Sequence, residues 1–166
     1  MNAPVPARER GVEILESREP RDRDYVNRIS VEITYSGGAS LRMDGTCFGR
    51  RPRLVELDGV PLDAELDGDL LVTRHGDRPG MVGRIGTLLG ERGVNIDRVD
   101  LGALPRNGSH ASPSQMVASQ MAASQTVPLA VGVFGVSGEL DDGALAAVRS
   151  VDGVASACLV RFPTIR

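Results

Sequence analysis

The chain has 166 residues, which is enough for one ordinary domain or two very small ones. Hydrophobic residues make up 41% of it and charged residues 25%, so most of the chain can fold around a core. Aromatic residues amount to only 3%, the net charge is −3 and every basic residue is Arg, which argues against nucleic-acid binding, an anionic membrane surface and any chemistry that needs a lysine amine.

The first 24 residues are charged and mixed in sign, with a short apolar group around Val12–Leu15. Two interpretations stay open for this N-terminal segment. It is either a mobile tail, or a short strand or frayed helix that packs on a surface offered by the rest of the chain.

Residues 25–68 show the alternation typical of half-buried strands. Gly37-Gly38 and Asp58-Gly59 are turn dipeptides between these runs. The predicted strands are Ile29–Tyr35, Ser40–Phe48, Leu54–Leu57 and Val60–Leu66. We expect a small antiparallel sheet, which needs a neighbour to pack against.

Residues 69–166 repeat one order of elements twice. In the first unit a strand at Leu70–Val72 precedes a helix with one apolar face, for which Asp77 is the predicted N-cap and Pro79 lies in the first turn, and a strand through Val94–Leu101 follows. The second unit has a strand, a helix capped by Asp141 and a last strand. These run over Leu129–Val136, from Asp141 to Val148, and over Ala155–Phe162.

The sum is an α+β chain with a ferredoxin-like βαββαβ domain at 69–166, preceded by a small antiparallel β-rich domain at 25–68. Residues 103–127 interrupt the second domain with a five-residue serine–glutamine repeat, which matches neither helix nor strand. We interpret the repeat as a low-complexity loop insertion.

Several kinds of chemistry have no motif here. The sequence has no dinucleotide fingerprint, no phosphate-binding loop and no nucleophile elbow. Cys47 and Cys158 stand far apart and there are two histidines, His75 and His110, so we expect no disulfide framework, metal or cofactor. No apolar run has transmembrane length and the N-terminus lacks the features of a signal peptide, so a cytoplasmic location is expected.

The informative segment runs from His75 to Asn95. His75 and Asp77 stand where a strand ends and a helix begins, and a helix start offers amide donors and partial positive charge to a small carboxylate. Asp77 can face an ammonium group, and Asn95 begins the returning strand, next to the first or facing a partner subunit. Together they suit a zwitterion, although each residue also has a purely structural interpretation, as a cap, a turn residue or a solvated loop residue.

Three strings in this segment carry a family resemblance: Asp77-Arg78-Pro79-Gly80, Gly83–Gly90 and Gly93-Val94-Asn95-Ile96. They resemble the ACT regulatory domain of D-3-phosphoglycerate dehydrogenases. The upstream strings Asp44–Gly49 and Pro52–Gly59 resemble the intervening, allosteric substrate-binding domain of the long form of these enzymes.

The resemblance implies a regulatory module of L-serine biosynthesis. By position, His75, Asp77 and Asn95 correspond to residues that bind L-serine, and the ACT domain implies a homodimer. In the intervening domain, Arg50, Arg51 and Arg53 offer charge for a phosphorylated effector, or form only a solvated turn. The family's catalytic domains have no counterpart, so no enzyme activity is expected of this chain alone.

Three interpretations follow and stay open at this stage. The chain is an amino-acid sensor; or it is part of a phosphoglycerate dehydrogenase or of an L-serine dehydratase, acting with a separate catalytic chain; or it is a degenerate remnant that binds nothing.

Overall fold

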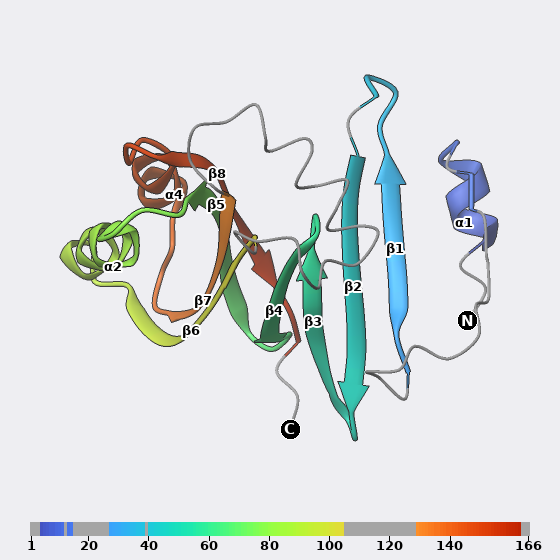
Figure 1. The fold of residues 1–166 in the computed structure, drawn as a ribbon, viewed down its shortest axis with the longest axis horizontal. Coiled ribbons are helices and arrows are strands. Elements are labelled where there is room, and N and C mark those ends of the chain that lie inside the picture. The colour runs from blue at the N-terminus through green and yellow to red at the C-terminus, as the bar shows by residue number, and fades with distance from the viewer. Residues whose placement is uncertain (1–3, 12, 15–26, 39, 105–128, 164–166) are drawn as a thin grey trace.

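The computed structural model describes residues 4–11, 13–14, 27–38, 40–104 and 129–163. In these ranges two four-stranded antiparallel sheets pack together, and helices α2 and α4 cover the outer face of the second sheet (Figure 1). The result is three layers in the order helices, sheet, sheet. The α+β prediction is confirmed.

The first sheet is a meander in which each strand pairs with the next. Its strands are β1 (Ile29–Thr34), β2 (Ser40–Phe48), β3 (Arg51–Leu57) and β4 (Val60–Glu65). Asp58 and Gly59 join β3 to β4 with φ angles of 49° and 80°, the left-handed values that a two-residue hairpin needs. All four predicted strands are confirmed: β2 has the predicted ends, and the other three differ at one end by one to three residues.

The second sheet has the predicted βαββαβ order, with strands arranged β6-β7-β5-β8. Its elements are β5 (Asp69–Gly76), α2 (Met81–Glu91), β6 (Asn95–Ala103), β7 (Leu129–Ser137), α4 (Asp142–Arg149) and β8 (Val154–Arg161). β5 and β6 are both antiparallel to β7 and so run in the same direction. This is the ferredoxin-like arrangement expected from the sequence.

The helix starts differ from each other. Asp141 caps α4, because its carboxylate accepts a hydrogen bond of 2.6 Å from the Ala144 amide. The prediction that Asp77 caps α2 is wrong: the N-cap is Gly80, with φ of 83° and no side-chain cap, and Pro79 precedes the helix instead of lying in its first turn.

The N-terminal segment contains a helix that the sequence patterns did not predict, α1 (Pro4–Glu9). Most of the remaining residues of segment 1–24 lie outside the described part, as does the serine–glutamine repeat. The predicted division at residues 24, 68 and 103–127 stays a prediction.

The second sheet buries apolar residues on both faces. Under the helices lie Leu71, Ile85, Leu89, Val94, Phe134, Val136, Leu140, Ala144, Val148 and Ala157. Between the sheets lie Leu54, Leu57, Val60, Leu62, Ala64, Leu70, Leu104, Val131 and Val133. The second core draws residues from both sheets, so the small first sheet gains the neighbour it needs.

The sheets approach most closely where β6 crosses β4. A Cβ atom added at Gly102 would lie 2.1 Å from the Pro61 carbonyl oxygen and 2.9 Å from a Val60 methyl carbon. Since both positions belong to packed strands, only glycine fits at residue 102.

We predict that Gly102→Ala destabilises the chain, because the added methyl must push one sheet backbone away from the other. Overpacking a core costs about 1–3 kcal/mol, and a clash with backbone should fall at the upper end. Urea unfolding measures the change. Gly90→Ala is the control, since its site on α2 has open space and alanine there should stabilise by about 0.5–1 kcal/mol. Equal stability of Gly102→Ala and wild type would contradict the proposed packing.

Candidate functional site

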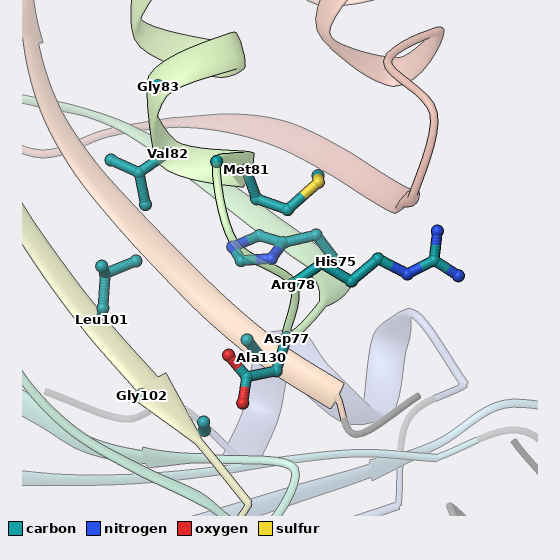
Figure 2. Close-up of a pocket in the computed structure, with 11 residues that line it drawn as sticks. His75, Asp77, Arg78, Met81, Val82, Gly83, Leu101, Gly102 and Ala130 are labelled. Atoms are coloured by element: carbon teal, nitrogen blue, oxygen red, sulfur yellow. The ribbon is translucent and has the colours of Figure 1, made fainter. Parts of the chain in front are cut away.

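A pocket of about 300 Å³ lies where β5 ends and α2 begins (Figure 2). His75 and Asp77 come from the end of β5 and the loop after it, and Met81 and Val82 from the first turn of α2. The last residues of β6, Leu101 to Ala103, form the opposite wall. The structure thus brings two of the three predicted ligand-binding residues to one cavity.

His75 is buried, with 3% of its surface exposed. Its Nδ1 atom lies 3.1 Å from the Gly76 carbonyl oxygen, and since a carbonyl only accepts, Nδ1 carries the proton and donates. In the neutral ring Nε2 is then an acceptor. Nε2 is buried and has no hydrogen-bond partner within the described ranges, an arrangement that costs free energy until a donor reaches it.

The start of α2 offers hydrogen-bond donors, whereas His75 offers an acceptor. The N-cap residue of α2 is Gly80, which has no side chain to cap the amide groups of the first turn. The helix dipole adds partial positive charge at the same place. An oxygen anion of small size fits this end of the pocket better than a cation does.

Asp77 brings a carboxylate to the pocket, on the side where Ala130 and Gly102 lie (Figure 2). The Arg78 side chain points away from it, and its Nη1 lies 3.9 Å from Asp152 in a solvent-exposed ion pair. The pocket therefore offers an acid, a buried imidazole acceptor and a helix start within one cavity.

Asn95 does not line this pocket. Asn95 pairs with Ser137 across the sheet and His75 pairs with Ala130, seven residues away along β7. At about 3.3 Å per residue the two side chains stand roughly 23 Å apart within one chain. The reason is topological: β5 and β6 run in the same direction, so the start of β6 lies at the opposite end of the sheet from the end of β5.

The pocket opens toward an edge of the sheet. β6 is an edge strand, and two of its apolar side chains, Val99 and Leu101, are 40% and 52% exposed. Exposed large apolar side chains on an edge strand are typical of a surface that another chain covers.

The arginines predicted as an anion site face carboxylates. Arg53 donates to Asp63, a hydrogen bond that raises the pKa of the guanidinium, and Arg51 lies 3.8 Å from Glu65. Arg50 is exposed in the β2–β3 turn. Two of the three charges are thus already balanced by acids of the same sheet.

A further ionic contact joins the two sheets: Arg98 Nη1 of β6 lies 3.7 Å from Glu65 Oε2 of β4. Arg98 on β6 donates to the Glu65 carbonyl oxygen at 3.0 Å and lies 3.3 Å from Asp100. Burial raises the pKa of the Asp100 carboxyl, and the positive charge of Arg98 offsets this only in part.

Sequence analysis missed the apolar walls of the pocket. Met81 and Val82 lie on the apolar face predicted for the helix, and Leu101 is the last residue named for the predicted strand. The alternation of Val99, Leu101 and Ala103 along β6 was the available signal, but only the topology shows that this strand is an edge. Within the described residues, no three or more His, Cys, Asp or Glu side chains gather as metal ligands, and no described helix could cross a membrane.

Comparison with known proteins places this site in context. Residues 69–110 match the family model of the ACT domain. Residues 1–58 match that of the D-3-phosphoglycerate dehydrogenase intervening domain. The chain thus combines the two regions that its sequence motifs resemble.

Curated relatives that this chain matches are named D-3-phosphoglycerate dehydrogenase. The protein of Synechocystis is 26% identical over 98% of this chain and 26% of its own length. Those of Mycobacterium tuberculosis and Archaeoglobus fulgidus are 38% and 34% identical, over 61% and 53% of this chain and 20% and 16% of their own lengths. The chain therefore spans about a quarter or less of these relatives.

We predict that Asp100→Asn stabilises the fold relative to wild type more at pH 7 than at pH 4. A raised folded-state pKa means that the folded chain holds the proton more tightly than the unfolded chain. The contribution of Asp100 to the free energy of unfolding is therefore complete below its ordinary pKa. This contribution is lost as the pH rises through the raised folded-state pKa. Asparagine at residue 100 does not titrate, so the variant lacks this pH dependence.

Urea unfolding of both proteins between pH 4 and pH 7 measures the difference. The control Ser156→Ala changes an exposed residue that does not titrate, and its effect should be the same at each pH. An Asp100→Asn difference that shrinks toward pH 7 would contradict the prediction.

Proposed function

We propose that this chain is a regulatory module of L-serine biosynthesis, which binds a small amino acid, L-serine first, in the pocket at the start of α2. The observation that carries the proposal is the buried Nε2 of His75, unpartnered in the described chain, in a pocket that the start of α2 also lines. Combined ACT and intervening-domain matches, and relatives named D-3-phosphoglycerate dehydrogenase, support the pathway.

Each group of an amino acid has a counterpart in the pocket. The ligand carboxylate takes the amide groups and positive dipole at the start of α2. The ligand ammonium takes Asp77, and the serine hydroxyl can donate to the His75 acceptor. Because Asp77 and the helix start lie on one loop, ligand binding ties the end of β5 to α2.

Two copies of the chain complete the site in this proposal. A two-fold axis that pairs the β6 edges antiparallel sets the start of one β6 beside the end of the other. Asn95 of the partner then approaches the wall formed by Leu101 to Ala103. The exposed Val99 and Leu101 side chains support pairing at this edge.

This function needs no catalysis by the chain itself. The sequence contains no dinucleotide fingerprint, and the two matched regions are the ACT and intervening domains. The activity regulated would belong to a D-3-phosphoglycerate dehydrogenase catalytic unit.

Calorimetric titration with L-serine and a panel of other amino acids tests the binding. Asp77→Asn keeps the shape of the side chain and removes the charge that faces the ammonium, so we expect binding at least tenfold weaker, about 1.4 kcal/mol. Asp152→Asn makes the same change on an exposed acid and should leave binding unchanged. A folded chain that binds no amino acid at all would refute the sensor.

Light scattering tests the pairing. We expect the wild-type chain near 35 kDa, twice its 17.6 kDa mass, and Val99→Lys near the single mass, because a buried charge would face its own copy across the two-fold axis. Ile29→Lys, on the exposed face of β1, is the matched control and should stay at the wild-type mass. A wild-type monomer at saturating L-serine would contradict pairing.

A further inference from the structure

The two strands that carry the pocket each present their other face to the first sheet. Successive residues of a strand point to opposite faces of its sheet. On β5, Leu71 enters the core under the helices and Leu70 enters the core between the sheets. The same alternation sets His75 in the pocket and Arg74 against the first sheet. The pocket and the contact between the sheets therefore share one segment of strand.

Behind β5 this contact is an ion pair. Arg74 Nη2 donates to Asp58 Oδ2, in the hairpin that joins β3 to β4. The other carboxylate oxygen of Asp58 accepts a hydrogen bond of 2.8 Å from the Arg42 amide of β2, and the Asp58 amide donates to the Arg42 carbonyl oxygen at 2.8 Å. Three bonds thus hold Asp58 in place, and they fix the residue directly before His75 to the first sheet.

Behind β6 the contact involves the backbone itself. Leu101 lines the pocket (Figure 2), and the next residue, Gly102, directs its missing side chain at the Pro61 carbonyl oxygen of β4, because a Cβ atom there would lie 2.1 Å from it. Further along the strand, Arg98 donates to the Glu65 carbonyl oxygen at 3.0 Å. The wall of the pocket is therefore fixed to β4 at two points.

Ligand binding and the contact between the sheets restrain the same segments from opposite faces. A ligand that pairs with His75 orders the end of β5, and the pair of Arg74 with Asp58 orders the same residues from behind. A restraint on a segment that is already ordered costs less conformational entropy, so the two restraints strengthen each other. By linkage, the factor by which the contact tightens ligand binding equals the factor by which the ligand tightens the contact.

Resting on the proposed function, we propose that the first sheet is coupled to the pocket, and that Arg74 and Arg98 are the positioning residues that carry this coupling. Neither of them lines the pocket. Arg74 acts through its neighbour His75, and Arg98 acts through the strand that forms the wall at Leu101. The signal of a bound amino acid then reaches the Asp58 hairpin and β4, and a change imposed on the first sheet alters the affinity of the pocket.

Calorimetric titration of L-serine into the full chain tests the coupling from the side of the pocket. Arg74→Met and Arg98→Met each remove one contact and keep much of the length of the side chain. We expect about threefold weaker binding in each variant and about tenfold in the double variant, because the contacts lie on separate strands. Arg161→Met is the matched control, since it breaks an ion pair with Asp69 at the other end of β5, and should bind as wild type does.

Asp58→Asn tests the same ion pair from the first sheet. The asparagine oxygen can still accept from the Arg42 amide, while the charge that faces Arg74 is lost. Asp58→Asn should weaken L-serine binding as much as Arg74→Met, and the two changes together should weaken it no further, because either one removes the whole contact. Circular dichroism of each titrated sample ensures that affinities are compared between folded chains.

Hydrogen exchange measures the coupling from the side of the first sheet. In the wild-type chain, saturating L-serine should slow exchange of the β3 and β4 amides about tenfold, the factor lost in affinity by the double variant, although neither strand lines the pocket. In the double variant at saturation, the slowing should be confined to the second sheet. A purely structural role of the two arginines would instead lower protection of the first sheet with and without L-serine alike.

Four results would overturn the proposal. These are wild-type affinity in the double variant, an equal loss of affinity in Arg161→Met, first-sheet exchange that does not respond to L-serine in a wild-type chain that binds it, and a full first-sheet response in the double variant. A wild-type chain that binds no amino acid is a distinct outcome, which removes the proposed function and this inference with it.

Discussion

The burial of β7 on both faces is the constraint on which the rest of the structure depends. Seven consecutive residues of this strand are buried. Val131 and Val133 enter the core between the sheets, while Phe134 and Val136 enter the core under the helices. Gly132 is closed in as well, since a Cβ there would lie 2.7 Å from the Phe134 ring. A strand that is apolar on both faces needs a layer on each side, so the helices and the first sheet are both required.

A central β7 leaves β6 at an edge, and this decides where a ligand can bind. The pocket forms where the end of β5, the start of α2 and the end of β6 meet, and its outer wall is the edge itself. In a central strand the same residues would be buried between neighbouring strands. The edge position leaves the pocket open on one side in the single chain, so its closure and its third polar residue can both come from a second copy.

Much of the fold was predictable because it follows from local patterns. Alternation marked the strands, the Asp58-Gly59 turn has the φ values that its residues favour, and the two faces of β7 could be read from the order of its side chains. The helix α1 lacked such a pattern. The packing of one sheet on the other was expected only in general terms, because the close contact of Gly102 with Pro61 depends on where two distant strands cross.

The candidate site was predictable in part. Strand-to-helix order placed His75 and Asp77 together, because a single residue, Gly76, lies between them. The separation of Asn95 from them follows from the parallel course of β5 and β6, which depends on strand order and not on spacing. The cap was misassigned for a local reason: Asp77 stands three residues before Gly80, whose left-handed φ lets the chain enter α2 without a side-chain cap.

The first sheet and the start of α2 differ in whether their positive charge is already paired. Carboxylates of the first sheet are balanced by its own arginines or by one from the second sheet: Arg53 pairs with Asp63, and Arg74 of β5 pairs with Asp58. An anion there would have to displace a pair already made. The start of α2 instead offers a dipole, which contributes about 0.3–1 kcal/mol to a bound charge at an exposed site. A few such contacts reach the roughly 4 kcal/mol of a millimolar complex, and weak reversible binding of this kind is what a metabolite sensor requires.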